Sequence, residues 1–194
     1  MQSLIDHART FPHTVARRSD EFRELAAGQA PEALFITCSD SRVIPSLITG
    51  ARPGELFELR TAGNIVPPYD TGRPSGEAAT VEYALRVLGV RDVVVCGHSH
   101  CGAVGALVRG DDLSAAPAVH GWLSHSVTAL PRTDDLAHAV RSHAVAQLAA
   151  LRGYPAVRER LERGDLALHA WYYEVDTGLV TTHLPETVGE FGPL

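Results

Sequence analysis

The pattern of apolar and polar positions changes period several times along this chain, and each change predicts a new element. Residues 14–27 carry apolar side chains at helical spacing among charged ones, which predicts an amphipathic helix that ends near Gly28. Residues 33–37 form a short apolar run, typical of a parallel strand that is buried on both faces. A second strand is predicted over residues 55–59.

The helical period returns over residues 75–87, and a β-rich run at 92–96 follows Gly89. With the preceding strand, these segments predict a βαβ unit. A turn at residues 176–178 separates the last two expected strands. The remaining expected elements are helices over 101–108, 135–151 and 157–161 and strands over 167–175 and 179–183.

Strands that alternate with helices predict an α/β fold with a mostly parallel central sheet, an antiparallel edge strand and helices on both faces. The 194 residues suffice for a single domain with a full hydrophobic core. Within residues 1–194 we expect an N-terminal helical arm over 1–30 and an α/β core over 31–194. Residues 61–75 are rich in Gly and Pro and predict a functional loop.

Composition and charge exclude several classes of protein. The chain has 17 basic and 23 acidic side chains and a formal net charge of −6, which argues against nucleic acid as a partner. Its apolar runs are far shorter than the roughly 20 residues of a membrane span, and residues 1–6 open no signal peptide. We therefore expect a cytoplasmic protein without a membrane partner. Three cysteines are an odd count for a disulfide scaffold and predict free thiols.

Candidate chemistry lies directly after two predicted strands, where ligands bind in open α/β sheets. Cys38 ends the first strand, and His98 and Cys101 follow the third. Two thiolates and a neutral imidazole suit Zn²⁺, and three protein ligands leave a fourth position open, as in catalytic zinc sites. Cys101 also lies at a predicted helix N-terminus, which favours its thiolate.

Spacing alone leaves other interpretations of these residues open. A Cys–His nucleophile pair of a hydrolase shows the same residue types. Cys38 by itself is also typical of a small buried apolar residue at a strand end, and Asp40 is also typical of a helix cap. Cys96, inside the third strand, is interpreted as core packing.

Three ordered motifs carry a resemblance to a known family. Residues 38–43 (Cys-Ser-Asp-Ser-Arg-Val) and 98–102 (His-Ser-His-Cys-Gly) resemble the signature of the β-class carbonic anhydrases. Residues 60–69 resemble the central loop of that family, and residues 82–84 resemble its helix motif. The resemblance implies one Zn²⁺ per chain.

The resemblance also assigns roles to single residues. It implies that Cys38, His98 and Cys101 are the zinc ligands and that Asp40 and Arg42 form the catalytic dyad beside the metal. Two thiolates with a neutral His leave a Zn²⁺ centre formally uncharged, whereas three His ligands leave it at +2.

A substrate pocket is implied by further matches to the family pattern. It would contain Gln29, Phe57, Gly102 and Tyr83. The Gln marks the members in which water holds the fourth zinc position, whereas other members carry a Trp where this chain has Phe35. We therefore expect the open type, although direct binding of the dyad carboxylate to zinc is the alternative resting state.

The implied activity is the reversible hydration of CO₂ to bicarbonate and a proton by a zinc-bound hydroxide, the reaction of a carbonic anhydrase, a lyase. The implied partner is a second copy, in a dimer or a dimer-based oligomer with the N-terminal arm packed on the partner. Two alternatives remain open from the sequence. One is a hydrolase of COS or CS₂ with the same fold, and the other is a non-catalytic zinc protein that binds bicarbonate.

Overall fold

The computed structural model of this chain describes residues 1–125, 131, 133–187 and 190–194. It divides into two compact units, Met1–Ala30 and Pro31–Leu194.

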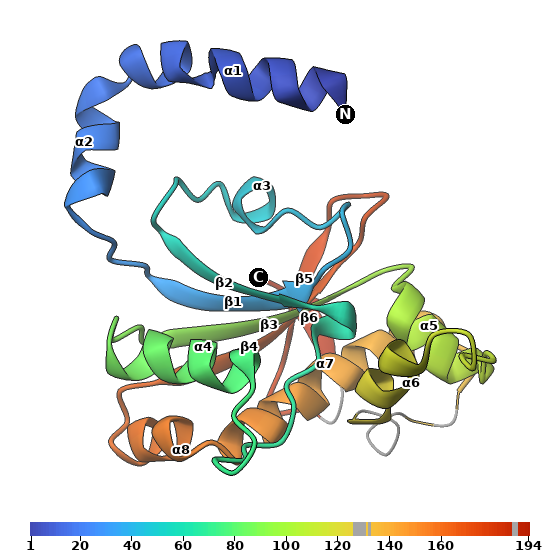
Figure 1. Ribbon diagram of the computed structural model, residues 1–194. Coiled ribbons are helices and arrows are strands. Elements are labelled where there is room, and N and C mark those ends of the chain that lie inside the picture. Colours follow the sequence, from blue (N-terminus) through green and yellow to red (C-terminus); the bar gives the residue numbers. More distant parts are fainter. Residues whose placement is uncertain (126–130, 132, 188–189) are drawn as a thin grey trace. The chain divides into compact units, whose positions relative to one another are not determined.

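A six-stranded sheet forms the centre of the Pro31–Leu194 unit, with the strand order β2-β1-β3-β4-β5-β6 (Figure 1). The first four strands of that order run parallel, and β5 and β6 pair antiparallel. The predicted α/β fold with a mostly parallel sheet is therefore confirmed, and its antiparallel edge consists of two strands. The strands are β1 (Ala33–Cys38), β2 (Leu56–Thr61), β3 (Asp92–His98), β4 (Ala167–Tyr173), β5 (Val180–His183) and β6 (Phe191–Pro193).

The helices of this unit include those expected from the sequence and some that were not. The short helices α3 and α6 were not predicted, because each has only one or two turns and shows no clear apolar period. Both begin with Pro at the first position, where its fixed φ suits a helix start. The elements are α3 (Pro45–Thr49), the 3₁₀ turn η1 (Ala62–Asn64), α4 (Gly76–Arg86), α5 (Gly102–Arg109), α6 (Pro117–Leu123), α7 (Leu136–Arg152) and α8 (Pro155–Glu162).

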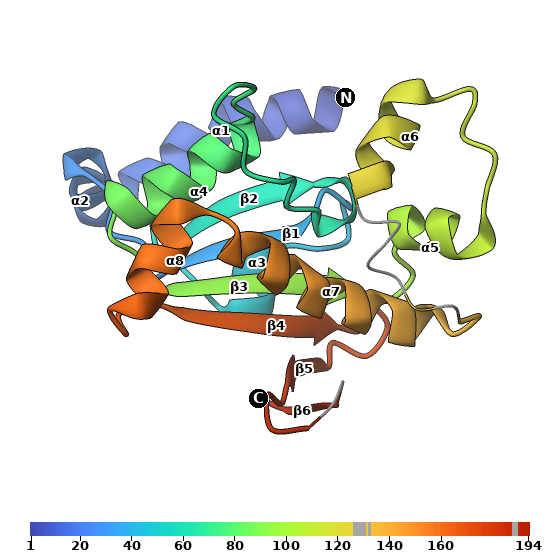
Figure 2. The ribbon, with the colours of Figure 1, turned by 90° about the horizontal axis from the view of Figure 1, so that it is seen from below.

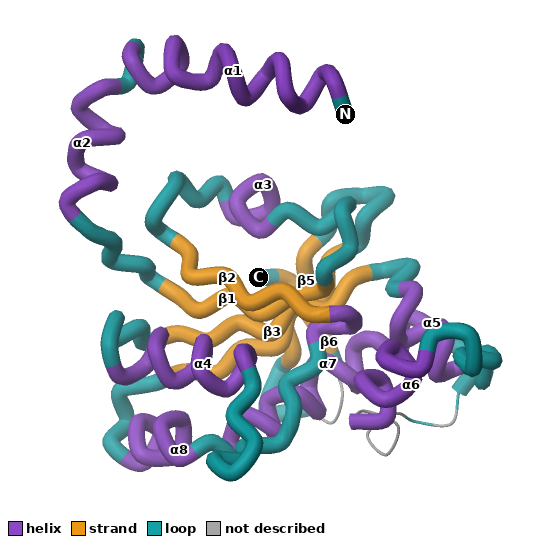
Figure 3. The backbone as a smooth tube through the Cα atoms, in the orientation of Figure 1, coloured by secondary structure: helices purple, strands orange, loops and turns teal. Residues whose placement is uncertain are grey.

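The main core lies between the sheet and the helices α4, α7 and α8, which cover one face (Figures 1 and 2). Leu34 and Ile36 of β1 are fully buried against these helices, whereas Phe35 points to the opposite face. This explains why β1 is apolar throughout rather than alternating. The opposite face carries the short α3 (Figure 3) and a smaller cluster that contains Cys96, so the interpretation of Cys96 as a core residue is confirmed.

The Met1–Ala30 unit consists of α1 (Gln2–Ala16) and α2 (Ser19–Ala27). The prediction of one helix over 14–27 is wrong in extent, because Arg18 adopts a non-helical conformation and α2 starts anew after it. The Phe11 and Phe22 rings meet edge to face, 6.0 Å apart, across this break. Neither helix contains a buried residue. In the part of the chain that the structure describes, no helix is long and apolar enough to cross a lipid bilayer.

Candidate metal centre

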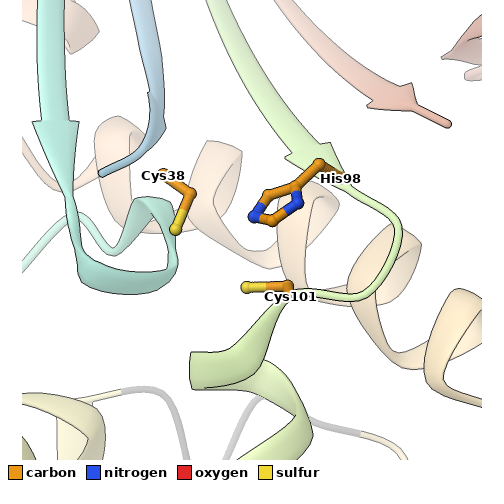
Figure 4. A group of neighbouring side chains, drawn as sticks. All are labelled: Cys38, His98 and Cys101. Atoms are coloured by element: carbon orange, nitrogen blue, oxygen red, sulfur yellow. The ribbon is translucent and has the colours of Figure 1, made fainter. Parts of the chain in front are cut away.

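Three potential ligands meet at the carboxyl ends of the sheet strands (Figure 4). Cys38 is the last residue of β1 and His98 is the last residue of β3, and these two strands are parallel neighbours. Cys101 is the N-cap of α5, reached from β3 by a turn in which His100 takes a positive φ of 57°. The sheet order thus brings together side chains that lie 60 residues apart in the sequence.

The ligand atoms of Cys38, His98 and Cys101 all lie within 4.8 Å of one another, and the three side chains are buried. A tetrahedral zinc site with Zn–S of about 2.3 Å and Zn–N of about 2.0 Å requires separations of roughly 3.5–3.8 Å. The observed separations therefore exceed the ideal ones by about 1.3 Å at most. Small side-chain rotations are enough to remove this difference.

The imidazole of His98 is prepared to act as a ligand. Its Nδ1 lies 2.9 Å from the carbonyl oxygen of Ser99, which can only accept a hydrogen bond, so Nδ1 carries the proton. Nε2 is then left with a lone pair, and this buried atom has no hydrogen-bond partner among the described residues. An unpaired buried nitrogen beside two thiols fits a metal ion, which would provide the missing partner.

The two thiols share one negative charge. The Cys101 thiol and the Gly63 amide stabilise the Cys38 thiolate and lower the pKa of Cys38 to about 4 against the effect of burial. The hydrogen bond to this thiolate, together with burial, raises the pKa of Cys101. A cation between the sulfurs would favour the second ionisation, because metal ligation requires both thiolates.

A carboxylate stands next to this cluster. Asp40 Oδ2 lies 3.9 Å from His98 Nε2. Arg42 donates from Nε and its backbone N–H to Asp40 Oδ1, each at 3.0 Å, and from Nη2 to Oδ2 at 2.7 Å. These hydrogen bonds from Arg42 hold the pKa of Asp40 far below its usual range. Arg42 Nη2 also donates to the carbonyl oxygen of His100, which ties the two loops of the site together.

Comparisons with known proteins agree with this geometry. The sequence profile of the carbonic anhydrase family matches residues 33–180. The carbonic anhydrase of Pseudomonas aeruginosa is 48% identical over 190 residues, which cover 93% of this chain and 86% of that protein. The chain belongs to the β-class carbonic anhydrases.

Solved structures of the family extend the match to the whole fold. The β-carbonic anhydrase CcaA is 40% identical with a TM-score of 0.92, and the alignment covers 100% of this chain and 99% of that one. A tetrameric β-carbonic anhydrase from Sordaria macrospora is 27% identical with a TM-score of 0.78, and the alignment covers 98% of this chain and 97% of that one.

Arg60 supports the loop that follows Cys38 in this β-carbonic anhydrase, in a way that the sequence did not reveal. Its guanidinium donates to the carbonyl oxygens of Cys38, Asp40 and Val43 at distances between 2.7 and 3.2 Å. Arg60 stands in the family's central loop motif, but the motif does not say that its partners are backbone carbonyls. The contact fixes the loop that carries the dyad of Asp40 and Arg42.

The 3₁₀ turn η1 supplies a second contact that the sequence did not reveal. The backbone N–H of Gly63 donates to Cys38 Sγ at 3.3 Å. Gly63 has a φ of +73°, and a Cβ there would lie 3.1 Å from the Cβ of Ala103. Both the positive φ and the close approach require glycine.

The predicted pocket residues are distributed unevenly. Gly102 follows Cys101 directly at the start of α5 and is exposed. Phe57 and Tyr83 stack on each other with ring centroids 5.8 Å apart, but Phe57 lies four residues before Thr61, the strand neighbour of Cys38. At about 3.3 Å per residue this distance is roughly 13 Å along the strand. The structure therefore does not bring these two rings to the three candidate ligands of their own chain.

Gln29 belongs to the Met1–Ala30 unit, where it is exposed. Its proposed pocket role stays a prediction.

Proposed function

We propose that this β-carbonic anhydrase catalyses the reversible hydration of CO₂ with one Zn²⁺ held by Cys38, His98 and Cys101. The observation that carries the proposal is the buried Cys-His-Cys cluster, in which His98 Nε2 lacks a partner among the described residues and faces an Arg-held carboxylate. A purely structural zinc site is closed by four protein ligands, whereas this cluster offers three. When bound, Zn²⁺ supplies a hydroxide nucleophile near neutral pH.

Asp40 and Arg42 would orient the nucleophile. Because Arg42 keeps Asp40 ionised, the carboxylate can only accept a hydrogen bond, so it directs the O–H of the nucleophile toward itself. The oxygen lone pair then points away from Asp40, toward the position where the carbon of CO₂ can approach. Bicarbonate carries an O–H at the same place and can keep the same hydrogen bond.

The contacts of Asp40 favour the open arrangement of the site. Both carboxylate oxygens are engaged by Arg42, with three hydrogen bonds of 2.7–3.0 Å. Direct binding of Asp40 to a metal would have to break at least part of this fork, which is a strong charge-assisted interaction. We therefore propose that Asp40 acts beside the metal and not as its fourth ligand.

A second copy of the chain would complete the substrate pocket. Phe57 and Tyr83 are too far along β2 and α4 to reach the metal cluster of their own chain, so a pocket role requires that they face the cluster of a partner. The helix α1 has apolar side chains but no buried residue, which is typical of a helix that packs in an assembly. We propose a dimer or a dimer-based oligomer, in which Gln29 also contributes to the pocket.

Metal analysis combined with a hydration assay tests the proposal. We expect about one zinc per chain, CO₂ hydration that disappears when a chelator removes the metal, and recovery when zinc is added back. Stoichiometric zinc without CO₂ hydration would contradict the proposed activity. Parallel measurement of sulfide release from COS and CS₂ shows whether either is a better substrate than CO₂, which would make hydrolysis of heterocumulene sulfides the main activity.

A further inference from the structure

The Ala62–Gly63 peptide group links the candidate metal ligand Cys38 to a tryptophan on α6. Its N–H belongs to Gly63 and donates to Cys38 Sγ at 3.3 Å. Its carbonyl belongs to Ala62 and accepts a hydrogen bond from Trp122 Nε1 at 2.8 Å. A hydrogen bond to the carbonyl of a peptide polarises the whole group and strengthens the bond that its N–H donates. Trp122 therefore acts on the thiolate through one shared peptide.

The following peptide is held from the other side. His143 on α7 is fully buried, and its Nε2 lies 2.7 Å from the carbonyl oxygen of Gly63. This oxygen only accepts, so Nε2 carries the proton, and Nδ1 lies 3.4 Å from the Gln147 side-chain amide. Gln147 in turn accepts from the backbone N–H of Val66 at 2.8 Å. The network fixes the ring of His143 and hence the direction of the Gly63 carbonyl.

We propose that Trp122 and His143 are positioning residues that hold the η1 turn so that the Gly63 N–H donates to the Cys38 sulfur and reduces the negative charge that Cys38 gives to the metal. The proposal rests on the metal site proposed above. Two thiolates cancel the formal charge of Zn²⁺, which weakens it as a Lewis acid, and an N–H directed at one sulfur offsets part of that loss. Neither residue is one of the three candidate ligands or part of the Asp40–Arg42 pair.

The two contacts differ in how much their loss should matter. The Gly63 carbonyl is buried, so removal of the His143 donor leaves it without a partner. Ala62 is exposed, so water can reach its carbonyl when the Trp122 indole is removed, and the protein remains folded. We therefore expect a larger effect from His143→Leu than from Trp122→Phe, with His143→Gln as a conservative variant that keeps a donor at a similar reach.

Absorption of the cobalt-substituted protein tests the proposal without an activity measurement. A hydrogen bond stabilises the sulfur lone pair, so its loss lowers the energy of sulfur-to-cobalt charge transfer. We expect this band to move to longer wavelength in Trp122→Phe, further in His143→Leu, and back toward the wild-type position in His143→Gln. The matched control is Trp171→Phe, whose indole packs against Phe35 on the other face of the sheet.

The zinc-loaded variants provide a second readout. We expect kcat/KM for CO₂ hydration to fall by roughly two- to tenfold, less than the roughly 10–100-fold typical of a direct partner of a metal ligand. The pH of half-maximal activity should rise in the same order as the wavelength shift.

The outcomes separate this inference from the proposed function. Wild-type protein that binds no cobalt would contradict the metal site itself. Stoichiometric cobalt with an unshifted band in Trp122→Phe, or an equal shift in Trp171→Phe, would overturn the positioning role alone. If His143→Leu does not fold, Trp122→Phe decides the question by itself.

Discussion

The two ends of the central sheet both contain buried polar side chains, but their hydrogen bonding differs. At the amino ends of β3 and β4, Arg160 of α8 is 9% exposed and donates to the carbonyl oxygens of Leu85 and Val90 at 3.0 and 3.3 Å. It also binds the Asp165 carboxylate at 2.7 Å and the Asp165 carbonyl at 3.0 Å. All three nitrogens of this guanidinium have partners, which is typical of a structural cluster.

At the carboxyl ends of the strands, by contrast, some buried polar atoms have no hydrogen-bond partner among the described residues. His98 Nε2 and both side-chain amide atoms of Asn64 are buried without a hydrogen-bond partner in the described ranges. A hollow of about 460 Å³ adjoins Arg160 at the opposite end, lined in part by Arg86 and Glu159, which form an ion pair. The unpaired buried atoms, and not this hollow, point to the candidate metal site.

The largest effect is expected from loss of a thiol at the carboxyl end. Cys101→Ser replaces a thiolate ligand by a hydroxyl, which stays protonated and binds zinc weakly. We predict that zinc content falls to near zero and that CO₂ hydration falls to the uncatalysed rate. Metal analysis of the purified variant, with circular dichroism to verify folding, checks this prediction.

Retention of one zinc per chain by Cys101→Ser would show that Cys101 is not a ligand. The two ends of the sheet would then no longer differ in the presence of a complete set of three ligands.

The next largest effect is expected from the carboxylate beside the cluster. Asp40→Asn preserves the shape of the side chain but places an N–H₂ group in part of the space where an acceptor is needed. We predict that zinc is retained and that kcat/KM falls by about 100-fold. Asp92→Asn is the matched control. Asp92 is the first residue of β3, at the opposite end of that strand from His98, and its carboxylate pairs with His169 of β4.

Loss of zinc from Asp40→Asn would show that Asp40 is a fourth ligand. The proposed open arrangement would then be wrong.

The position of the ligands could be predicted because it follows from local rules. A buried strand ends at Cys38 and another ends at His98, and parallel strands present their carboxyl ends at one edge. The β-class motifs then favoured a zinc site over a Cys–His nucleophile pair. Strand existence and helix α7 followed from apolar periodicity in the same way.

The support of the site could not be predicted, because it depends on contacts between distant segments. His143 contacts Gly63 across 80 residues, and Trp122 contacts Ala62 across 60. No spacing rule relates such pairs. The stacking of Phe57 on Tyr83 away from the cluster was likewise invisible in the motifs, which place residues in a family pattern and not in one chain.

A moderate effect on stability is expected at the amino ends of the strands. Arg160→Met leaves the carbonyls of Leu85 and Val90 unpaired, and we predict a loss of about 2–4 kcal/mol in the free energy of unfolding. This loss corresponds to a fall in Tm of about 5–15 °C for a chain of this size. Zinc content and kcat/KM of the folded protein should not change. Thermal unfolding and the hydration assay measure the two quantities separately.

Arg163→Met serves as the control for Arg160, because Arg163 is exposed and its ion pairs with Glu159 and Asp165 are 3.5 and 3.7 Å long. Its effect should stay within about 0.5 kcal/mol. An equal loss in both variants would mean that the buried carbonyl contacts of Arg160 contribute no more than surface charge does.

The smallest effect is expected from the third cysteine. Cys96 is completely buried on the face opposite the main core, and burial raises the pKa of its thiol to about 12. Cys96→Ala removes one buried sulfur atom, for which we predict a loss of about 1 kcal/mol in the free energy of unfolding with full zinc content and activity. Denaturant titration and metal analysis check this prediction.

Alkylation sharpens the contrast among the three cysteines, because the thiolate is the reactive form. At neutral pH the high pKa and burial of Cys96 should keep it unmodified until the chain unfolds. Cys38 in metal-free protein carries a thiolate and should react first, and added zinc should protect it. Reaction of Cys96 before Cys38 in the folded apoprotein would contradict the assignment of one thiol to the core and the other to the metal. The two residues lie on neighbouring strands but differ in two ways. Cys38 ends β1 beside polar partners on the face of Leu34 and Ile36, whereas Cys96 lies within β3 among apolar residues on the opposite face.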